Sequence, residues 1–141
     1  IESVHDADIE VMANYIFGLP IDSKETMKKT FDLSKDLCTA GWNTYAAMAL
    51  PGSQLYKTAI EKQYTLPEDY AGYSFHAYNT QPLPTEFLTP EEVLEYRDQC
   101  FTDYHLYEPF LRKIENKFGV DAVENIKKMT MVKLKRKILG D

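Results

Sequence analysis

Two short stretches decide how this chain folds: VMANYIFGLP at residues 11–20 and TYAAMALPG at residues 44–52. Each is a largely apolar run that stops at a proline or a Pro-Gly pair, which is typical of a buried strand followed by a turn. A helix-like pattern separates the two runs. This order of elements predicts a β/α protein in which the ends of the strands carry the site.

The stretch between the two predicted strands has the signals of one helix. Asp22 and Glu25 stand three residues apart and predict an Asp variant of the capping box. Apolar residues then recur every three to four positions across residues 23–40, which predicts a helix with one buried face. Gly41 is expected to end this helix in the left-handed conformation that glycine adopts without strain.

The remaining signals predict two regions, a β/α region at residues 1–63 and a mainly helical region at residues 64–141. The second region begins with residues 64–88, which are rich in aromatic residues and proline and are expected to wrap across the core. Strands are predicted at about residues 9–17 and 43–49, and further helices at about residues 53–63, 89–106, 109–119 and 122–139.

Length and composition narrow the class of protein. A closed eight-unit barrel usually takes about 250 residues, whereas this chain has 141 and begins at Ile1, so we expect a piece of a longer polypeptide. It is 44% hydrophobic and 27% charged, as a globular domain is. No apolar run approaches the ~20 residues that span a bilayer, and no leader is evident. We therefore expect a cytoplasmic protein without a membrane span.

The net charge of −6 is unevenly distributed along the chain. Residues 127–141 carry +5 and the remainder carries −11. Two interpretations of the basic segment stay open: a surface that contacts nucleic acid or an acidic partner, or the solvated face of the last predicted helix. The acidic body disfavours general affinity for nucleic acid, so we expect no nucleic-acid partner.

A family resemblance rests on both strands taken together. The chain reads NYIFGLP at residues 14–20, then the capped helix, then LPGSQLY at residues 50–56. In this order the motifs resemble the C-terminal barrel region of radical S-adenosylmethionine (radical SAM) enzymes, in particular members with an upstream cobalamin-binding domain. The resemblance covers about residues 9–63. It implies an α/β fold made of the last βα units of a partial TIM-like barrel, followed by a mainly helical C-terminal region.

The resemblance also implies an activity for the parent protein, that of an iron–sulfur oxidoreductase. Enzymes of this family use a 4Fe-4S cluster to cleave SAM to a deoxyadenosyl radical, which abstracts hydrogen from the substrate; whether cobalamin is also used stays open. By matching position, Asn14, Ile16 and Gly18 correspond to the strand that lies along the adenosine. Met48 falls where the family places the floor beneath the substrate or adenosine. For each of these residues, ordinary packing is the alternative.

Two departures from the family pattern limit what this chain does alone. The cluster signature CxxxCxxC is absent, and Cys38 and Cys100 stand in no metal-ligand spacing. We therefore expect no cluster, no metal and no catalytic residue within the chain, and no activity without the upstream part of the same polypeptide. Ile21 and Asp22 replace the Gly and Glu that usually follow Gly-Leu-Pro. An unpaired strand edge would also allow the isolated chain to dimerise.

Two other classes of protein stay open. A self-contained α+β binding or scaffold module would use residues 64–88 to grip a peptide or a helix. An ordinary β/α hydrolase or transferase would need a nucleophile or an acid–base pair at the strand ends, where only Asp22 stands. His76 is a candidate substrate contact or proton donor, with a structural hydrogen bond as the alternative. Trp42 is interpreted as packing at the helix-to-strand turn.

Overall fold

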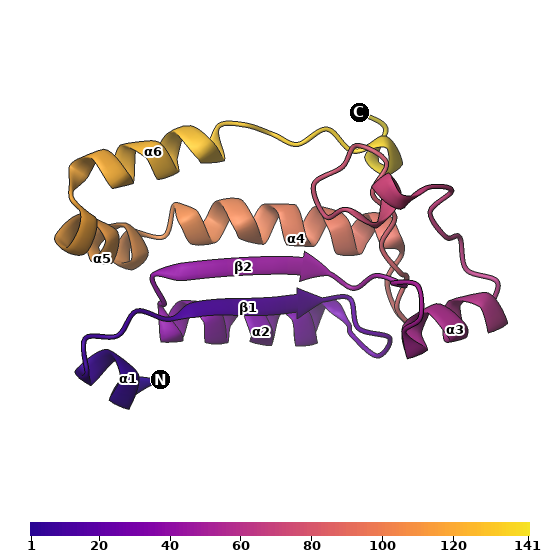
Figure 1. Ribbon diagram of the computed structural model, residues 1–141, viewed down its shortest axis with the longest axis horizontal. Helices are drawn as coiled ribbons and strands as arrows, with labels where there is room; N and C mark the ends of the chain where they lie inside the picture. Colours follow the sequence, from indigo (N-terminus) through magenta and orange to yellow (C-terminus); the bar gives the residue numbers. More distant parts are fainter.

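The computed structural model describes the whole chain, residues 1–141, as a mixed α/β fold with six α-helices and a two-stranded parallel sheet (Figure 1). The elements are α1 (Glu2–Asp6), β1 (Met12–Phe17), α2 (Lys24–Leu37), β2 (Gly41–Ala46), α3 (Gln54–Glu61), α4 (Pro90–His105), α5 (Glu108–Phe118) and α6 (Val120–Thr130), with 3₁₀ turns η1 (Tyr70–Tyr73) and η2 (Lys137–Leu139). The predicted α/β class is confirmed. None of the helices is long and apolar enough to cross a lipid bilayer.

The sheet is a single βαβ unit in which α2 connects two parallel strands (Figure 1). The register pairs Met12 with Gly41 at one end and Phe17 with Ala46 at the other. The ladder continues past the strands, because the Ala47 N–H donates to the Phe17 carbonyl at 2.8 Å. Parallel strands need such a crossover, since the end of one lies far from the start of the next. The predicted strand–helix–strand order is confirmed, although both strands are shorter than predicted.

The hydrophobic core lies on one face of this sheet, which α2 and α4 cover together. The Trp42 and Tyr104 rings stack with their centroids 4.7 Å apart and their planes within 10°. Trp42 therefore packs as expected, but at the centre of the core from β2 and not in a turn. The buried residues of this core are Phe17, Met27, Phe31, Trp42, Ala46, Leu88, Val93, Leu94, Cys100, Tyr104, Phe110, Ile114 and Val123.

The start of α2 differs from the prediction. Its N-cap is Ser23, and the capping box joins Ser23 to Thr26 instead of Asp22 to Glu25. Asp22 accepts hydrogen bonds from the Leu19 N–H at 2.9 Å and from the Thr26 hydroxyl at 2.7 Å. Its carboxylate therefore holds the turn ahead of the helix, one position earlier than a cap.

The end of α2 also differs, because Gly41 does not terminate it. Cys38 is the C-cap and adopts the left-handed conformation, with φ of 41°. Gly41 instead opens β2, where a Cβ atom would lie 2.4 Å from Sδ of Met12. Glycine at this position lets the Met12 side chain cross over the neighbouring strand.

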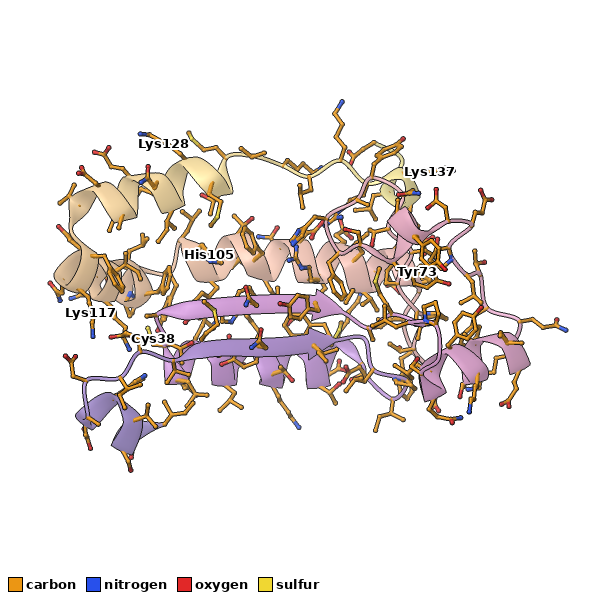
Figure 2. The ribbon with its side chains drawn as sticks, in the orientation of Figure 1. Cys38, Tyr73, His105, Lys117, Lys128 and Lys137 are labelled. Carbon is orange, nitrogen blue, oxygen red and sulfur yellow. The ribbon has the colours of Figure 1, made fainter.

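The prediction of a helix over residues 122–139 is wrong in its second half. α6 ends at Thr130, and the chain then runs without helical structure alongside α4 until η2 (Figure 1). The reason is Arg136, whose fully buried guanidinium pairs with Asp98 on α4 at 2.9 Å. The lysines of this segment remain in solvent, as Figure 2 shows for Lys128 and Lys137. The basic segment therefore has a solvated side, which is compatible with both interpretations of it, and one buried arginine, which was not expected.

Residues 64–88 lie against the end of the sheet, whereas the prediction had them wrap across the core. The Leu83 N–H donates to the Ala47 carbonyl at 2.9 Å, which ties the segment to the residue after β2. Leu83 is only 4% exposed, whereas Tyr70 is 89% and Phe87 is 65% exposed. The segment therefore packs unevenly and leaves several aromatic rings in solvent.

Candidate functional site

The second face of the two strands has no helix over it, and we call it the open face. It consists of alternate residues: Met12, Asn14 and Ile16 on β1, with Asn43 and Tyr45 on β2. Met12 is 63% exposed and Ile16 is 50% exposed. The residues between them point into the core, because successive side chains of a strand point to opposite faces. Apolar and amide groups are thus presented together to solvent on a rigid sheet.

A small polar cluster lies at the centre of the open face. Asn14 and Asn43 are direct partners in the strand register, and the Asn43 amide donates to Oδ1 of Asn14 at 3.1 Å. The Tyr45 hydroxyl donates to the same oxygen over a longer distance of 3.5 Å. The Tyr45 ring also packs on Phe75, with centroids 4.7 Å apart. These contacts orient the Asn14 side chain and leave its NH₂ group free to donate to a ligand.

Two of the four predicted site residues lie on this face, and two do not. Asn14 and Ile16 stand two positions apart on β1 and project from the same side of the sheet. Met48 is only 6% exposed and Gly18 is buried, so both lie behind the face at the carboxyl end of the strands. The structure therefore brings Asn14 and Ile16 together and separates them from the side chain of Met48.

Gly18 departs from the alternation of β1 at the point where the strand ends. Its φ is +79°, a left-handed value that glycine adopts more readily than other residues. A Cβ atom at this position would lie 2.4 Å from Cγ1 of Val93 on α4. Gly18 therefore has a packing role: it permits α4 to lie close to the strand end.

Sequence reasoning missed Asn43 and Tyr45. The signal for them was available, since β2 alternates between these residues and the buried Trp42, Thr44 and Ala46. What the sequence did not provide is the register, which sets Asn43 opposite Asn14 and Tyr45 opposite Ile16. Register depends on how two distant segments pair, so a single strand pattern does not determine it.

The outer edge of β1 is open as well as its face. Alternate residues of a parallel strand bond to the partner strand, and the bond from the Gly41 N–H to the Val11 carbonyl sets that alternation here. The backbone groups of Met12, Asn14 and Ile16 therefore point away from β2. No third strand pairs with them, because the sheet has only two strands.

An arginine side chain bonds one carbonyl on the outer edge of β2. Nε of Arg97, on α4, donates to the Thr44 carbonyl at 2.9 Å. The guanidinium thus takes the place of a neighbouring strand at this point. The two edges of the sheet are therefore unequal, because a side chain of α4 bonds the Thr44 carbonyl on the β2 edge.

Neither cysteine belongs to the open face. Cys38 and Cys100 both pack with the core, and Figure 2 shows Cys38 beside the start of β2. Burial raises the pKa of the Cys100 thiol to about 12 and also raises the pKa of Cys38 above its usual value. Both thiols are therefore protonated at neutral pH and are poor nucleophiles and metal ligands.

The histidines also lie away from the open face. His105 is 7% exposed, and its Nδ1–H donates to the Phe101 carbonyl at 2.8 Å. Burial lowers the pKa of His105, so the ring is neutral at pH 7. His76 lines a cleft beside α4, and its pKa is lowered by partial burial and then by the nearby charges of Arg97 and Arg136. No acid or base stands on the open face, whose groups are suited to binding.

Comparison with known proteins identifies no family or relative of this chain. No protein-family model, curated protein or solved structure matches the chain. No group of three or more histidine, cysteine, aspartate or glutamate side chains converges where it could hold a metal ion. The function is therefore inferred from the open face and the open edge of the sheet.

Proposed function

We propose that residues 1–63 are the last βα units of a radical SAM barrel, and that the open face is one wall of its active site. The observation that carries this proposal is a parallel sheet covered on one face only. Purely parallel sheets are almost always buried on both faces, whereas Met12 and Ile16 here are at least half exposed. In a partial barrel the second face looks onto the lumen, where substrate and cofactor bind.

The unequal edges of the sheet support the same proposal. A barrel wall continues on one side of β1 with the preceding strand, and the β1 edge is the open one. The last strand of a partial barrel ends the sheet, and on the β2 edge Arg97 bonds the Thr44 carbonyl in place of a further strand. The upstream part of the polypeptide is then the partner that completes the sheet.

The residues of this chain do not fit a 4Fe-4S cluster. Such a cluster needs several converging thiolates, whereas Cys38 and Cys100 are packed with the core and hold their protons. The cluster would have to be held by another part of the parent protein. No catalytic step is assigned to either cysteine.

The open face does fit the adenosine part of SAM. Ile16 and Met12 offer apolar surface for a flat ring, and the Asn14 NH₂ group can donate to a ring or ribose acceptor. When bound, SAM supplies the radical that takes hydrogen from the substrate. The three residues of the open face would orient the adenosine and exclude water. Gly18 and Met48 would support the strand ends from the buried side.

The test is to express the parent polypeptide from its native gene under anaerobic, iron-replete conditions and to measure 5′-deoxyadenosine release from SAM. The residues upstream should include CxxxCxxC on a strand-to-helix loop. Ile16→Glu, which places a charge on the open face, should lower the rate roughly a hundredfold. The matched control is Leu33→Glu on α2, because Leu33 is 52% exposed and Ile16 is 50% exposed, and this variant should keep its activity. An upstream sequence without the cysteine motif contradicts the proposal, as does an Ile16→Glu enzyme that retains full activity.

A second candidate, a non-catalytic α+β binding module, is supported by the exposed rings of residues 64–88. Tyr70 is 89% exposed and Phe87 is 65% exposed, as expected of a surface that grips a peptide. Light scattering after size-exclusion chromatography separates the two candidates. A self-contained module should be a monomer that unfolds cooperatively, whereas a barrel piece should associate through its open edge and face.

A further inference from the structure

The end of the chain, residues 131–141, contacts both α4 and residues 75–78, and we call it the C-terminal strap. The Lys137 N–H donates to the Tyr78 carbonyl at 2.8 Å. The Tyr78 hydroxyl donates in return to the Asp141 carbonyl at 3.0 Å. Figure 1 shows the end of the chain beside this part of the 64–88 segment. The strap is therefore joined to a segment far from it in the sequence.

Arg136 is the only buried residue of the C-terminal strap, and its side chain joins two other parts of the fold. Nε and Nη2 donate to the two carboxylate oxygens of Asp98 on α4, at 2.9 and 3.0 Å. Nη1 donates to the carbonyls of Phe75 and Ala77, at 2.9 and 3.1 Å. Because the guanidinium is planar and its donors are fixed relative to one another, it holds the backbone of residues 75–77 against α4.

The same carboxylate also ties β2 to α4. Oδ1 of Asp98 accepts a further hydrogen bond from Nη1 of Arg97 at 2.7 Å, and Nε of Arg97 donates to the Thr44 carbonyl on β2 at 2.9 Å. Thr44 and Phe75 are thus each joined to Asp98 through one arginine. These bonds set the position of one backbone segment relative to the other.

The Phe75 ring supports a residue of the open face. It packs on the ring of Tyr45, the residue after Thr44 on β2, with centroids 4.7 Å apart and planes at 50°. The Tyr45 hydroxyl reaches Oδ1 of Asn14 at 3.5 Å, which is at the limit of a hydrogen bond. A small displacement of the Tyr45 ring is therefore enough to remove this bond.

We infer that Arg136 is a positioning residue of the open face. By holding the carbonyls of Phe75 and Ala77, it keeps the Phe75 ring against Tyr45 and so directs the Tyr45 hydroxyl to Asn14. Side chains that meet a ligand depend on such supporting contacts for their orientation. That Asn14 meets a ligand rests on the proposed function, whereas the effect of Arg136 on Asn14 does not.

The experiment records the side-chain NH₂ signals of Asn14 by NMR in the ¹⁵N-labelled chain. Tyr45→Phe removes the hydroxyl alone and defines the shift that loss of this bond causes. Arg136→Gln should shift the Asn14 signals in the same direction. Asn116, exposed on α5, is the internal control and should not move. Lys135→Gln is the matched control, because it removes an exposed charge from the same strap, and it should leave Asn14 unchanged.

A double variant separates this effect from a general loosening of the fold. If Arg136 acts through the Tyr45 hydroxyl, Arg136→Gln should cause no further shift of Asn14 in the Tyr45→Phe background. Phe75→Ala tests the same contact in a chain that keeps Arg136, whose loss could unfold the protein, and should reproduce the shift. Phe87→Ala is its matched control, because Phe87 lies in the same segment and is 65% exposed.

Activity of the parent polypeptide gives a second measurement. Arg136→Gln should raise the KM for SAM about fivefold and leave kcat unchanged, as expected when one hydrogen bond that orients a binding group is lost. The inference is overturned if either folded variant, Arg136→Gln or Phe75→Ala, leaves the Asn14 signals in place. It is also overturned if their shifts add to that of Tyr45→Phe. Shifted Asn14 signals with an unchanged KM would support the inference and contradict the proposed function.

Discussion

The two faces of the same two strands differ in how far their side chains are buried. On the packed face, Trp42 is 4% exposed and stacks on Tyr104. On the open face, Met12 is 63% exposed, and Asn14 bonds only to its neighbours on the sheet. Both faces share one backbone and one set of ladder hydrogen bonds. The difference shows that the packed face supplies the stability, while the open face is free to serve binding.

The two faces also differ in whether their polar side chains have hydrogen-bond partners. The packed face encloses the Tyr15 hydroxyl, the Trp42 indole N–H and the Thr44 hydroxyl without partners. On the open face Asn14 and Asn43 pair with each other. An enclosed polar group without a partner costs about 1 to 3 kcal/mol. The core therefore holds together through ring and aliphatic packing that outweighs this cost.

The largest expected effect comes from removing the central ring of the packed face. Trp42→Ala should lower the free energy of unfolding by about 3 to 5 kcal/mol, because it leaves a cavity beside Tyr104. Ile16→Ala, which removes apolar volume from the open face of the partner strand, should cost less than about 1 kcal/mol. Urea unfolding of both variants measures the comparison. Equal losses would mean that the open face is also covered in the folded chain.

The next effect concerns the glycine at the end of β1. Gly18→Ala should destabilise the chain by about 1 to 3 kcal/mol. Alanine is strained at a positive φ, and its Cβ would also clash with the Val93 side chain. Gly52→Ala is the matched control, since Gly52 has φ of +88° but open space around it. It should show the strain alone, about 1 kcal/mol. If thermal unfolding gave the same shift for both, Val93 would not restrict the strand end.

The smallest effect tests an enclosed hydroxyl of the packed face. Thr44→Val should raise the free energy of unfolding by about 1 kcal/mol, because it replaces an unpaired hydroxyl with a methyl group of similar size. Thr39→Val provides the contrast, since the Thr39 hydroxyl donates to the Gly41 carbonyl at 2.9 Å. That variant should lose about 1 kcal/mol. Chemical unfolding that found Thr44→Val destabilised would show that its hydroxyl has a partner, such as an enclosed water.

Local signals in the sequence placed most of the elements correctly. A helix was predicted at about residues 89–106, and α4 (Pro90–His105) begins there with a capping box, in which the Glu92 N–H donates to the Thr89 hydroxyl. The start of α2 was misplaced by one residue, because Asp22 and Ser23 are both good caps and only the turn from Leu19 decides between them. A local sequence pattern defines the end of a helix only to within one or two residues.

Longer-range choices could not be predicted in the same way. The last helix was predicted to run through Arg136, since its apolar and basic residues suit a solvated helix. The structure instead buries Arg136 against Asp98, thirty-eight positions earlier in the chain. The candidate site shows the same limit, because Asn43 joins Asn14 only through the strand register.

The sequence by itself determined the strand–helix–strand order, the turns after each strand, the absence of a cluster signature and which residues of β1 share a face. These features depend on spacing within one segment, which the backbone periodicities of 2.0 and 3.6 residues convert into structure. Tertiary structure alone decided that one face of the sheet stays open, that Gly18 meets Val93, and that Arg97 and Arg136 share Asp98. These features depend on contacts between distant segments, whose energy is gained only when the whole chain packs.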